Sequence, residues 1–256
     1  MSFSNPSQYS LNGTDWNELQ ADEQTHVINT GEKIYFKANG LTPDDQNGIG
    51  QFTVSKSFNL SGNIMSMLFG DEAEDKTDLT GYDYAFLGLF FRTPVINISS
   101  DFLPATTLSN DCYTSMFYGC TSLITAPKLP ATTLTDNCYS NMFRNCVSLI
   151  TAPTLPATEL ASRCYSHMFY DTNVLPDCTN IDFRRESVVS SKALVGLFAG
   201  TKVTDKDLYN ILPINPSTGK YWLPVTTLTE GCYSDMFNGC TSFTTAPDLP
   251  ATTLAN

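Results

Sequence analysis

The chain has 256 residues, of which 41% are hydrophobic, and a formal net charge of −12 from 14 Lys and Arg against 26 Asp and Glu. This hydrophobic content predicts a folded chain with a core of its own. The acidic balance, without a basic cluster, argues against a nucleic-acid partner because phosphate groups need a positive surface. No apolar run approaches the ~20 residues that span a bilayer, so we expect no membrane insertion.

Residues 1–60 predict a small antiparallel β unit. Asn12-Gly13 and Thr30-Gly31 are turn signals, and the stretches around them alternate apolar and polar side chains, as at Val27. Because stacked repeats need a cover over their first unit, we expect residues 1–60 to form an N-terminal cap domain.

An acidic run follows the cap, at Asp71, Glu72, Glu74, Asp75 and Asp78. Such a run could bind calcium, but it lacks the ligand spacing of an EF-hand loop. We therefore expect a solvated charged loop.

From here the sequence repeats itself. LPATTLSNDCYTSMFYGCTSLITAP begins at Leu103, and a near copy, LPATTLTDNCYSNMFRNCVSLITAP, begins at Leu129. Further copies begin at Leu155 and Leu223, and a last one begins at Leu249. A strict period of 26 residues predicts a stack of similar structural units.

Weaker copies at Ala85 and Ala193 carry Leu-Phe where the others carry Met-Phe. The long gap before the Leu223 copy predicts an insertion at about 204–221. Its TDKDLYNILP predicts a short helix, capped by Thr204 and stopped by Pro213. One Phe anchors each copy except the incomplete one at Leu249, and these residues are Phe90, Phe117, Phe143, Phe169, Phe198 and Phe237.

Within one unit, Leu108, Cys112 and Met116 are spaced four residues apart, which predicts one apolar stripe on a short helix. SLITAP predicts a short strand closed by Pro127. The expected fold class is an α/β repeat solenoid over residues 61–256, with one short strand and one short helix per unit. The residues expected in its core are Cys112, Met116, Phe117, Cys138, Met142, Phe143, Cys164, Met168, Phe169, Cys232, Met236 and Phe237.

The run MFYGCTSLITAP resembles the BspA-type leucine-rich repeat, and the resemblance extends from Ala85 to Asn256. The family's unit is a few residues shorter, and we interpret the extra residues within CYTSMF as one added helical turn. The resemblance implies a leucine-rich-repeat-like solenoid from a surface or secreted protein of gut bacteria, often an adhesin. Similar repeats also occur in proteins of the phages that infect those bacteria.

The cysteines allow three interpretations: buried structural thiols, inter-repeat disulfides, or metal ligands. In a helix, Cys112 and Cys120 would lie roughly 10 Å apart, beyond disulfide reach. Zinc sites use tighter spacing and often His, but this chain has only His26 and His167. We favour buried thiols, without a metal or other cofactor.

Polar positions that differ between copies are the candidate ligand contacts. They are Lys128, Thr154, Asp248, Arg144 and Asn238, with Tyr221 and Trp222 as rings that could stack on a sugar. Trp16 is a further ring of this kind, although packing explains all three rings as well. No nucleophile motif or phosphate loop is present, so we expect no enzyme activity.

Two functions fit these observations. The first is a non-enzymatic adhesion module that presents its solenoid surface to a protein or glycan at the cell surface. The alternative is a structural or receptor-binding part of a phage virion, or a passive spacer. No signal peptide is visible in MSFSNPSQYS. The last copy breaks off before its helix, which predicts an open C-terminal end able to self-associate.

Overall fold

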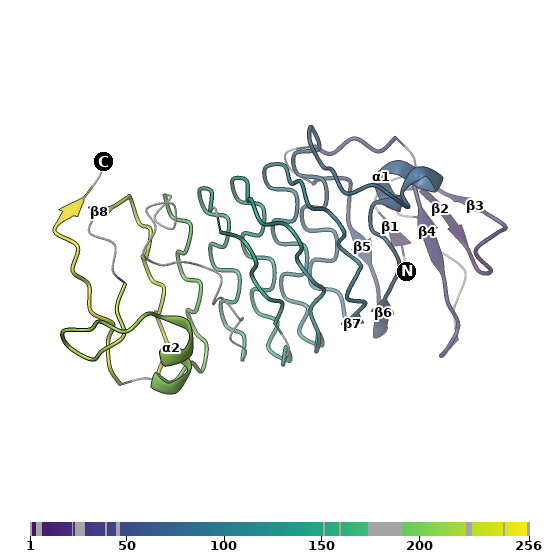
Figure 1. Cartoon of the computed structure of the whole chain (residues 1–256). Coiled ribbons are helices and arrows are strands. Elements are labelled where there is room, and N and C mark those ends of the chain that lie inside the picture. The colour runs from purple at the N-terminus through teal and green to yellow at the C-terminus, as the bar shows by residue number, and fades with distance from the viewer. Residues whose placement is uncertain are drawn as a thin grey trace.

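The computed structural model describes residues 2–3, 7–21, 23, 29–38, 40–44, 47–150, 152–158, 160–173, 191–223, 227–242 and 244–254. His26, Val27 and Cys178 lie outside these ranges. The described chain is elongated, with a small N-terminal sheet at one end and repeated segments side by side along its length (Figure 1).

The predicted N-terminal antiparallel sheet is confirmed. Strand β2 (Ser7–Ser10) pairs with β3 (Asn17–Leu19) on one side and with β4 (Tyr35–Lys37) on the other. Strand β1 (Ser2–Phe3) pairs with β5 (Phe52–Thr53) in a second antiparallel pair. Asn12 shapes the β2–β3 turn, because its Oδ1 accepts the N–H groups of Thr14 and Asp15, both at 2.9 Å.

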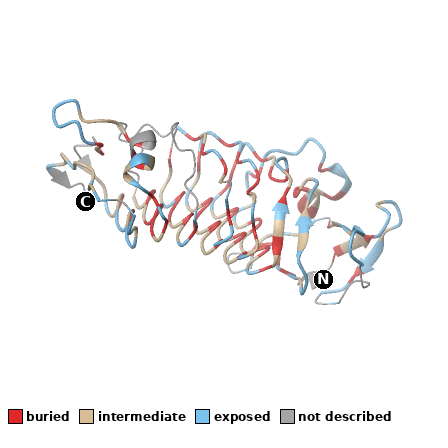
Figure 2. Cartoon of the chain, turned by 90° about the horizontal axis from the view of Figure 1, so that it is seen from below, coloured by how far each residue is buried: buried red, intermediate tan, exposed pale blue. Residues whose placement is uncertain are grey.

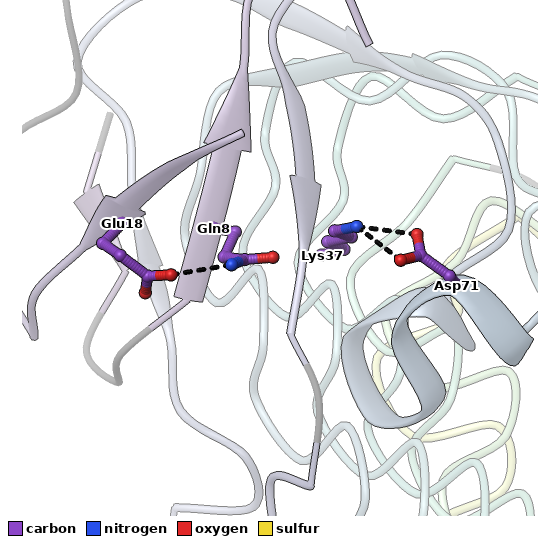
Figure 3. Close-up of polar contacts among 4 residues, drawn as sticks. All are labelled: Gln8, Glu18, Lys37 and Asp71. Carbon is purple, nitrogen blue, oxygen red and sulfur yellow. Dashed lines mark hydrogen bonds and ion pairs between the residues drawn. The ribbon is translucent and has the colours of Figure 1, made fainter. Parts of the chain in front are cut away.

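Polar contacts fix this sheet to the chain that follows it (Figure 3). Gln8 Nε2 donates to Glu18 Oε1 at 2.7 Å across β2 and β3. From β4, Lys37 Nζ contacts both carboxylate oxygens of Asp71, at 2.7 and 2.8 Å, and lies 4.2 Å from the ring centroid of Trp16. Asp71 belongs to the short 3-10 helix η1 (Gly70–Glu72), which follows α1 (Ser66–Phe69).

The N-terminal segment continues directly into the repeats. Strand β6 (Phe58–Leu60) pairs in parallel with β7 (Val95–Ile98). The ring of Phe52 stacks on that of Phe90 at a centroid distance of 5.2 Å. These contacts cross residue 60, where we expect a boundary, and the boundary itself stays a prediction.

The prediction of one short helix per unit is wrong. Residues 108–120 form a series of linked turns, in which the N–H groups of Cys112, Thr114 and Met116 each donate to the carbonyl three residues before. The N–H groups of the residues between them donate to the next copy, as Tyr113 does to Cys138 O at 3.0 Å and Ser115 to Ser140 O at 2.8 Å. No i−4 ladder is left, so the backbone is not helical.

A four-residue period replaces the expected helical period of 3.6. In residues 112–120 two buried residues alternate with two more exposed ones, and every fourth residue has a positive φ, as at Asp111 (56°), Ser115 (56°) and Gly119 (70°). The same three positions have positive φ in six segments, 84–93, 111–120, 137–146, 163–172, 192–201 and 231–240, which we call coils. Gly, Asn and Asp occupy most of these positions, because they tolerate this conformation best.

Parallel rows of rings join the coils. Phe117 stacks on Phe90 at 5.6 Å and on Phe143 at 5.8 Å, with interplanar angles of 4°. A second row runs from Tyr113 to Tyr139 and Tyr165, at 5.8 and 6.0 Å. The repeated Cys and aromatic residues therefore lie mostly in one buried cluster, and Figure 2 shows red segments that recur from one coil to the next.

The strand expected in SLITAP is reduced to a single bridge. Thr125 pairs in parallel with Asn97, and the described part of that segment contains no longer strand. Two further two-residue strands, β8 (Thr227–Leu228) and β9 (Thr253–Leu254), pair in parallel near the C-terminus.

The predicted helix in the insertion is confirmed. Helix α2 (Asp205–Ile211) begins at Thr204 with a reciprocal capping box to Asp207. The carboxylate of Asp205 accepts from Tyr221 OH, from Thr244 Oγ1 at 2.8 Å and from Thr245 N at 3.0 Å. These hydrogen bonds attach the insertion to the copy that begins at Leu223.

Candidate functional site

An open groove of about 560 Å³ crosses several repeats on the described surface. Ile96, Ile124 and Ile150 form a row along it, in which Ile124 N donates to Ile96 O at 2.8 Å and Ile150 N to Ile124 O at 3.0 Å. The residues that line the groove are Ser57, Ile96, Ser122, Ile124, Val147, Ser148, Leu149, Ile150 and Asn173.

The groove exposes aliphatic side chains to water. Ile150 is 73% exposed, Val147 46% and Ile124 36%, whereas their neighbours Leu123 and Leu149 are fully buried. In an extended segment successive side chains point to opposite faces, so only one of two adjacent apolar residues can enter the core. Fully burying such a side chain is worth about 1.5–3 kcal/mol, so a partner gains free energy by covering this row.

The polar lining of the groove is neutral. It consists of serine hydroxyls and of Asn173, whose Nδ2 donates to Val147 O at 2.7 Å. The lining offers apolar contact and hydrogen bonds, and its described residues include no carboxylate, imidazole, thiol or amine that could transfer a proton. This chemistry suits binding.

Three of the predicted ligand contacts lie on the surface, away from the groove lining. Lys128, Thr154 and Asn238 are exposed. Trp222 is half-buried and forms a parallel bridge with Asp248. Asn238 also donates from Nδ2 to Asp235 Oδ1 at 3.1 Å, so Lys128 and Thr154 are the predicted contacts best placed to meet a ligand.

The other predicted contacts make bonds within the molecule. The guanidinium of Arg144 lies over the rings of Tyr118 and Tyr170, at 5.7 and 4.4 Å. The Asp248 carboxylate accepts from Asn215 Nδ2 and Thr218 Oγ1, and Tyr221 is buried. Tyr221 is thus a packing residue, because its ring is not available to a sugar.

The predicted core residues lie inside, with Phe237 half-buried and the others buried. The seven described cysteines are free thiols, six of them buried and Cys240 half-buried. Burial raises the pKa of Cys138 to about 12 and that of Cys120 to about 11. The separation of roughly 10 Å expected for Cys112 and Cys120 assumed a helix that is absent, so that distance argument does not apply.

Thiol and hydroxyl groups share one stacked position at the end of each coil. Cys120 and Cys146 donate from Sγ to Phe90 O and Phe117 O in the preceding coil, both at 3.1 Å. Thr93 donates from Oγ1 to Phe90 O at 3.0 Å. These side chains satisfy buried carbonyls, which explains why Thr replaces Cys in some copies.

Within the part of the chain that the structure describes, no cluster of His, Cys, Asp and Glu is arranged to hold a metal ion. None of the described helices is long and apolar enough to cross a membrane. The exposed acidic loop includes Asp78, and hydrogen bonds from the side chain and then from the backbone N–H of Thr80 lower the pKa of its carboxylate.

Comparison of the chain with protein-family models, with curated proteins and with solved structures gave no match.

Sequence reasoning missed the exposed aliphatic row. Ile124 and Ile150 are identical between copies, as core residues of a repeat usually are. Val147 occupies the position that is Thr121 in the preceding copy. Two signals were available: the adjacent apolar pairs Leu-Ile in an extended run, and the replacement of Thr by Val at a surface position.

Proposed function

We propose that the chain is a repeat solenoid related in architecture to the BspA-type leucine-rich repeats, and that it acts as a non-enzymatic binding module. The observation that supports this function is the group of exposed aliphatic side chains in the groove, Ile124, Val147 and Ile150, which come from successive repeats. A passive spacer needs no such row, because exposed aliphatic side chains promote unwanted association. We place the module at a cell surface, as the resemblance implies.

The proposal is tested with the purified chain on a combined array of glycans and surface proteins. Wild type and the Ile150→Asp variant are compared, and Thr132→Asp places the same charge at an exposed residue outside the groove. We expect binding to at least one target that falls at least tenfold for Ile150→Asp and less than twofold for Thr132→Asp. Absence of binding to every target would favour the spacer, and equal binding by both variants would exclude the groove.

A further inference from the structure

We propose that the groove binds an amphipathic α-helix of a partner protein. This helix would lie across the repeats, with one aliphatic side chain for each repeat that it crosses. This inference rests on the proposed function and names the class of partner.

The lining selects an apolar protein surface. Its exposed side chains are aliphatic, and its hydroxyl and amide groups are neutral. Among the described residues it has no aromatic face on which a sugar or a base could stack, and no Arg or Lys to hold an anion. Aliphatic side chains of a protein are the groups that this lining covers best.

The spacing of the row selects a helix over a strand. Ile96, Ile124 and Ile150 are joined by backbone hydrogen bonds between parallel segments, which sets neighbouring residues about 4.8 Å apart. An α-helix presents the same face every ~5.4 Å along its axis. Over the three segments that carry Ile96, Ile124 and Ile150, the positions of its turns therefore differ from those of the row by only about 1 Å. A strand repeats one face every ~6.7 Å and would be about 4 Å out of step over the same length.

The charge of the molecule supports an uncharged contact face on that helix. The chain carries a net charge of −12, yet none of the nine lining residues is charged. A helix with a neutral aliphatic stripe therefore meets no buried unpaired charge in the groove. Acidic stripes are disfavoured by the field of the whole chain.

The experiment selects binders from a displayed library of random 18-residue peptides on the immobilised full chain. We expect enriched sequences with apolar residues at spacings of three and four and without charge on that face. Their capture should fall at least tenfold for Ile150→Asp and for Val147→Asp. It should change less than twofold for Thr132→Asp, which places the same charge at an exposed residue outside the groove.

Each outcome decides the inference. Enriched peptides with strictly alternating apolar residues would overturn the helix but leave a protein-binding module. Failure to enrich any peptide, together with Ile150-dependent binding on the glycan array, would overturn the partner class and leave the proposed function. Peptides that bind Ile150→Asp as well as wild type would remove the groove from the interaction. Because Ile150 is 73% exposed, its variant should melt within a few degrees of wild type, which a thermal scan checks.

Discussion

At the residue scale, adjacent residues of a coil differ sharply in how far their side chains are buried. Met142 is fully buried in the core, whereas its neighbour Asn141 is half-buried and has a positive φ of 56°. Asn141 Oδ1 accepts from Arg144 Nη1 at 3.2 Å, so an aspartate there would keep both the conformation and the hydrogen bond.

We therefore expect Met142→Asp to lower the free energy of unfolding by at least about 4 kcal/mol, because it buries a charge without a partner. Asn141→Asp should change it by less than about 0.5 kcal/mol. Chemical denaturation of the two variants beside wild type is the measurement. Similar midpoints would show that the two side chains lie on the same face.

The reactivity of the buried thiols gives a second prediction at this scale. Burial raises the pKa of Cys112, Cys146 and Cys164 well above the ordinary value, so almost no thiolate forms at pH 8. We expect a thiol reagent to label the native chain slowly, and the denatured, unreduced chain to give close to eight thiols. A count near zero after denaturation would establish disulfides.

At the scale of the element, the coil is a backbone structure defined by its positive-φ positions. Ser115 occupies one of them, with a φ of 56°, and is only half-buried. For a residue with a Cβ this conformation costs roughly 1–2 kcal/mol, and it is worst for β-branched side chains.

Substitutions at Ser115 distinguish this element from a helix. We expect Ser115→Gly to keep or raise stability and Ser115→Val to lower it by about 1–2 kcal/mol. In a helix the glycine variant would instead be less stable by ~0.5 kcal/mol or more. Melting curves of the pair decide between the two backbones, and a destabilised glycine variant beside a neutral valine variant would contradict the turn geometry.

The insertion is the second element with a defined attachment. Its Asp205 carboxylate accepts hydrogen bonds from Tyr221 and Thr244, and these bonds lower its pKa to about 2. A carboxylate with a depressed pKa stabilises the fold above its unfolded pKa of 3.8, and this contribution is lost as the pH falls toward 2.

We therefore expect the insertion to loosen between about pH 4 and pH 2. The indole N–H signal of Trp222 in NMR spectra should report this change. Asp205→Asn should show a similar loosening already at pH 7, whereas Asp75→Asn in the exposed acidic loop should not. An unchanged Trp222 signal in Asp205→Asn would show that the carboxylate does not hold the insertion.

At the scale of the whole molecule, the backbone hydrogen bonds between coils run in one direction. The first five coils each donate backbone N–H groups toward the coil that follows, as Asn137, Tyr139 and Asn141 do. Within the described residues, the N–H groups of Gly231 and Asp235 in the coil at 231–240 donate to no acceptor. The stack thus has a donor side that is satisfied between the coils and open at Gly231 and Asp235.

This direction predicts a gradient of hydrogen exchange. Peptides that cover residues 231–240 should exchange markedly faster than those that cover 137–146, because amides without hydrogen bonds are not protected. Equal protection that disappears on dilution would instead indicate self-association at this face. Protection that is equal at every concentration would contradict the open donor row.

Much of the architecture could be predicted from the sequence. The period of 26, the buried Cys and aromatic letters, the Asn12-Gly13 turn and the capped helix after Thr204 all follow from local rules of spacing, turn chemistry and capping. Spaced Asn, Asp and Gly residues also signalled the positive-φ positions, although a spacing of four resembles a helical stripe until the backbone is seen.

Only the tertiary structure decided the conformation of the coil and the location of the groove. The N–H of Tyr113 finds its acceptor on Cys138, in the next copy, so no reading of one copy could show that the helical hydrogen bonds are missing. Asp205 and Thr244 meet across 39 residues for the same reason. Ile124 and Leu123 are both apolar in sequence, and stacking of the copies decides which one is buried, because a single extended layer has only one inner face.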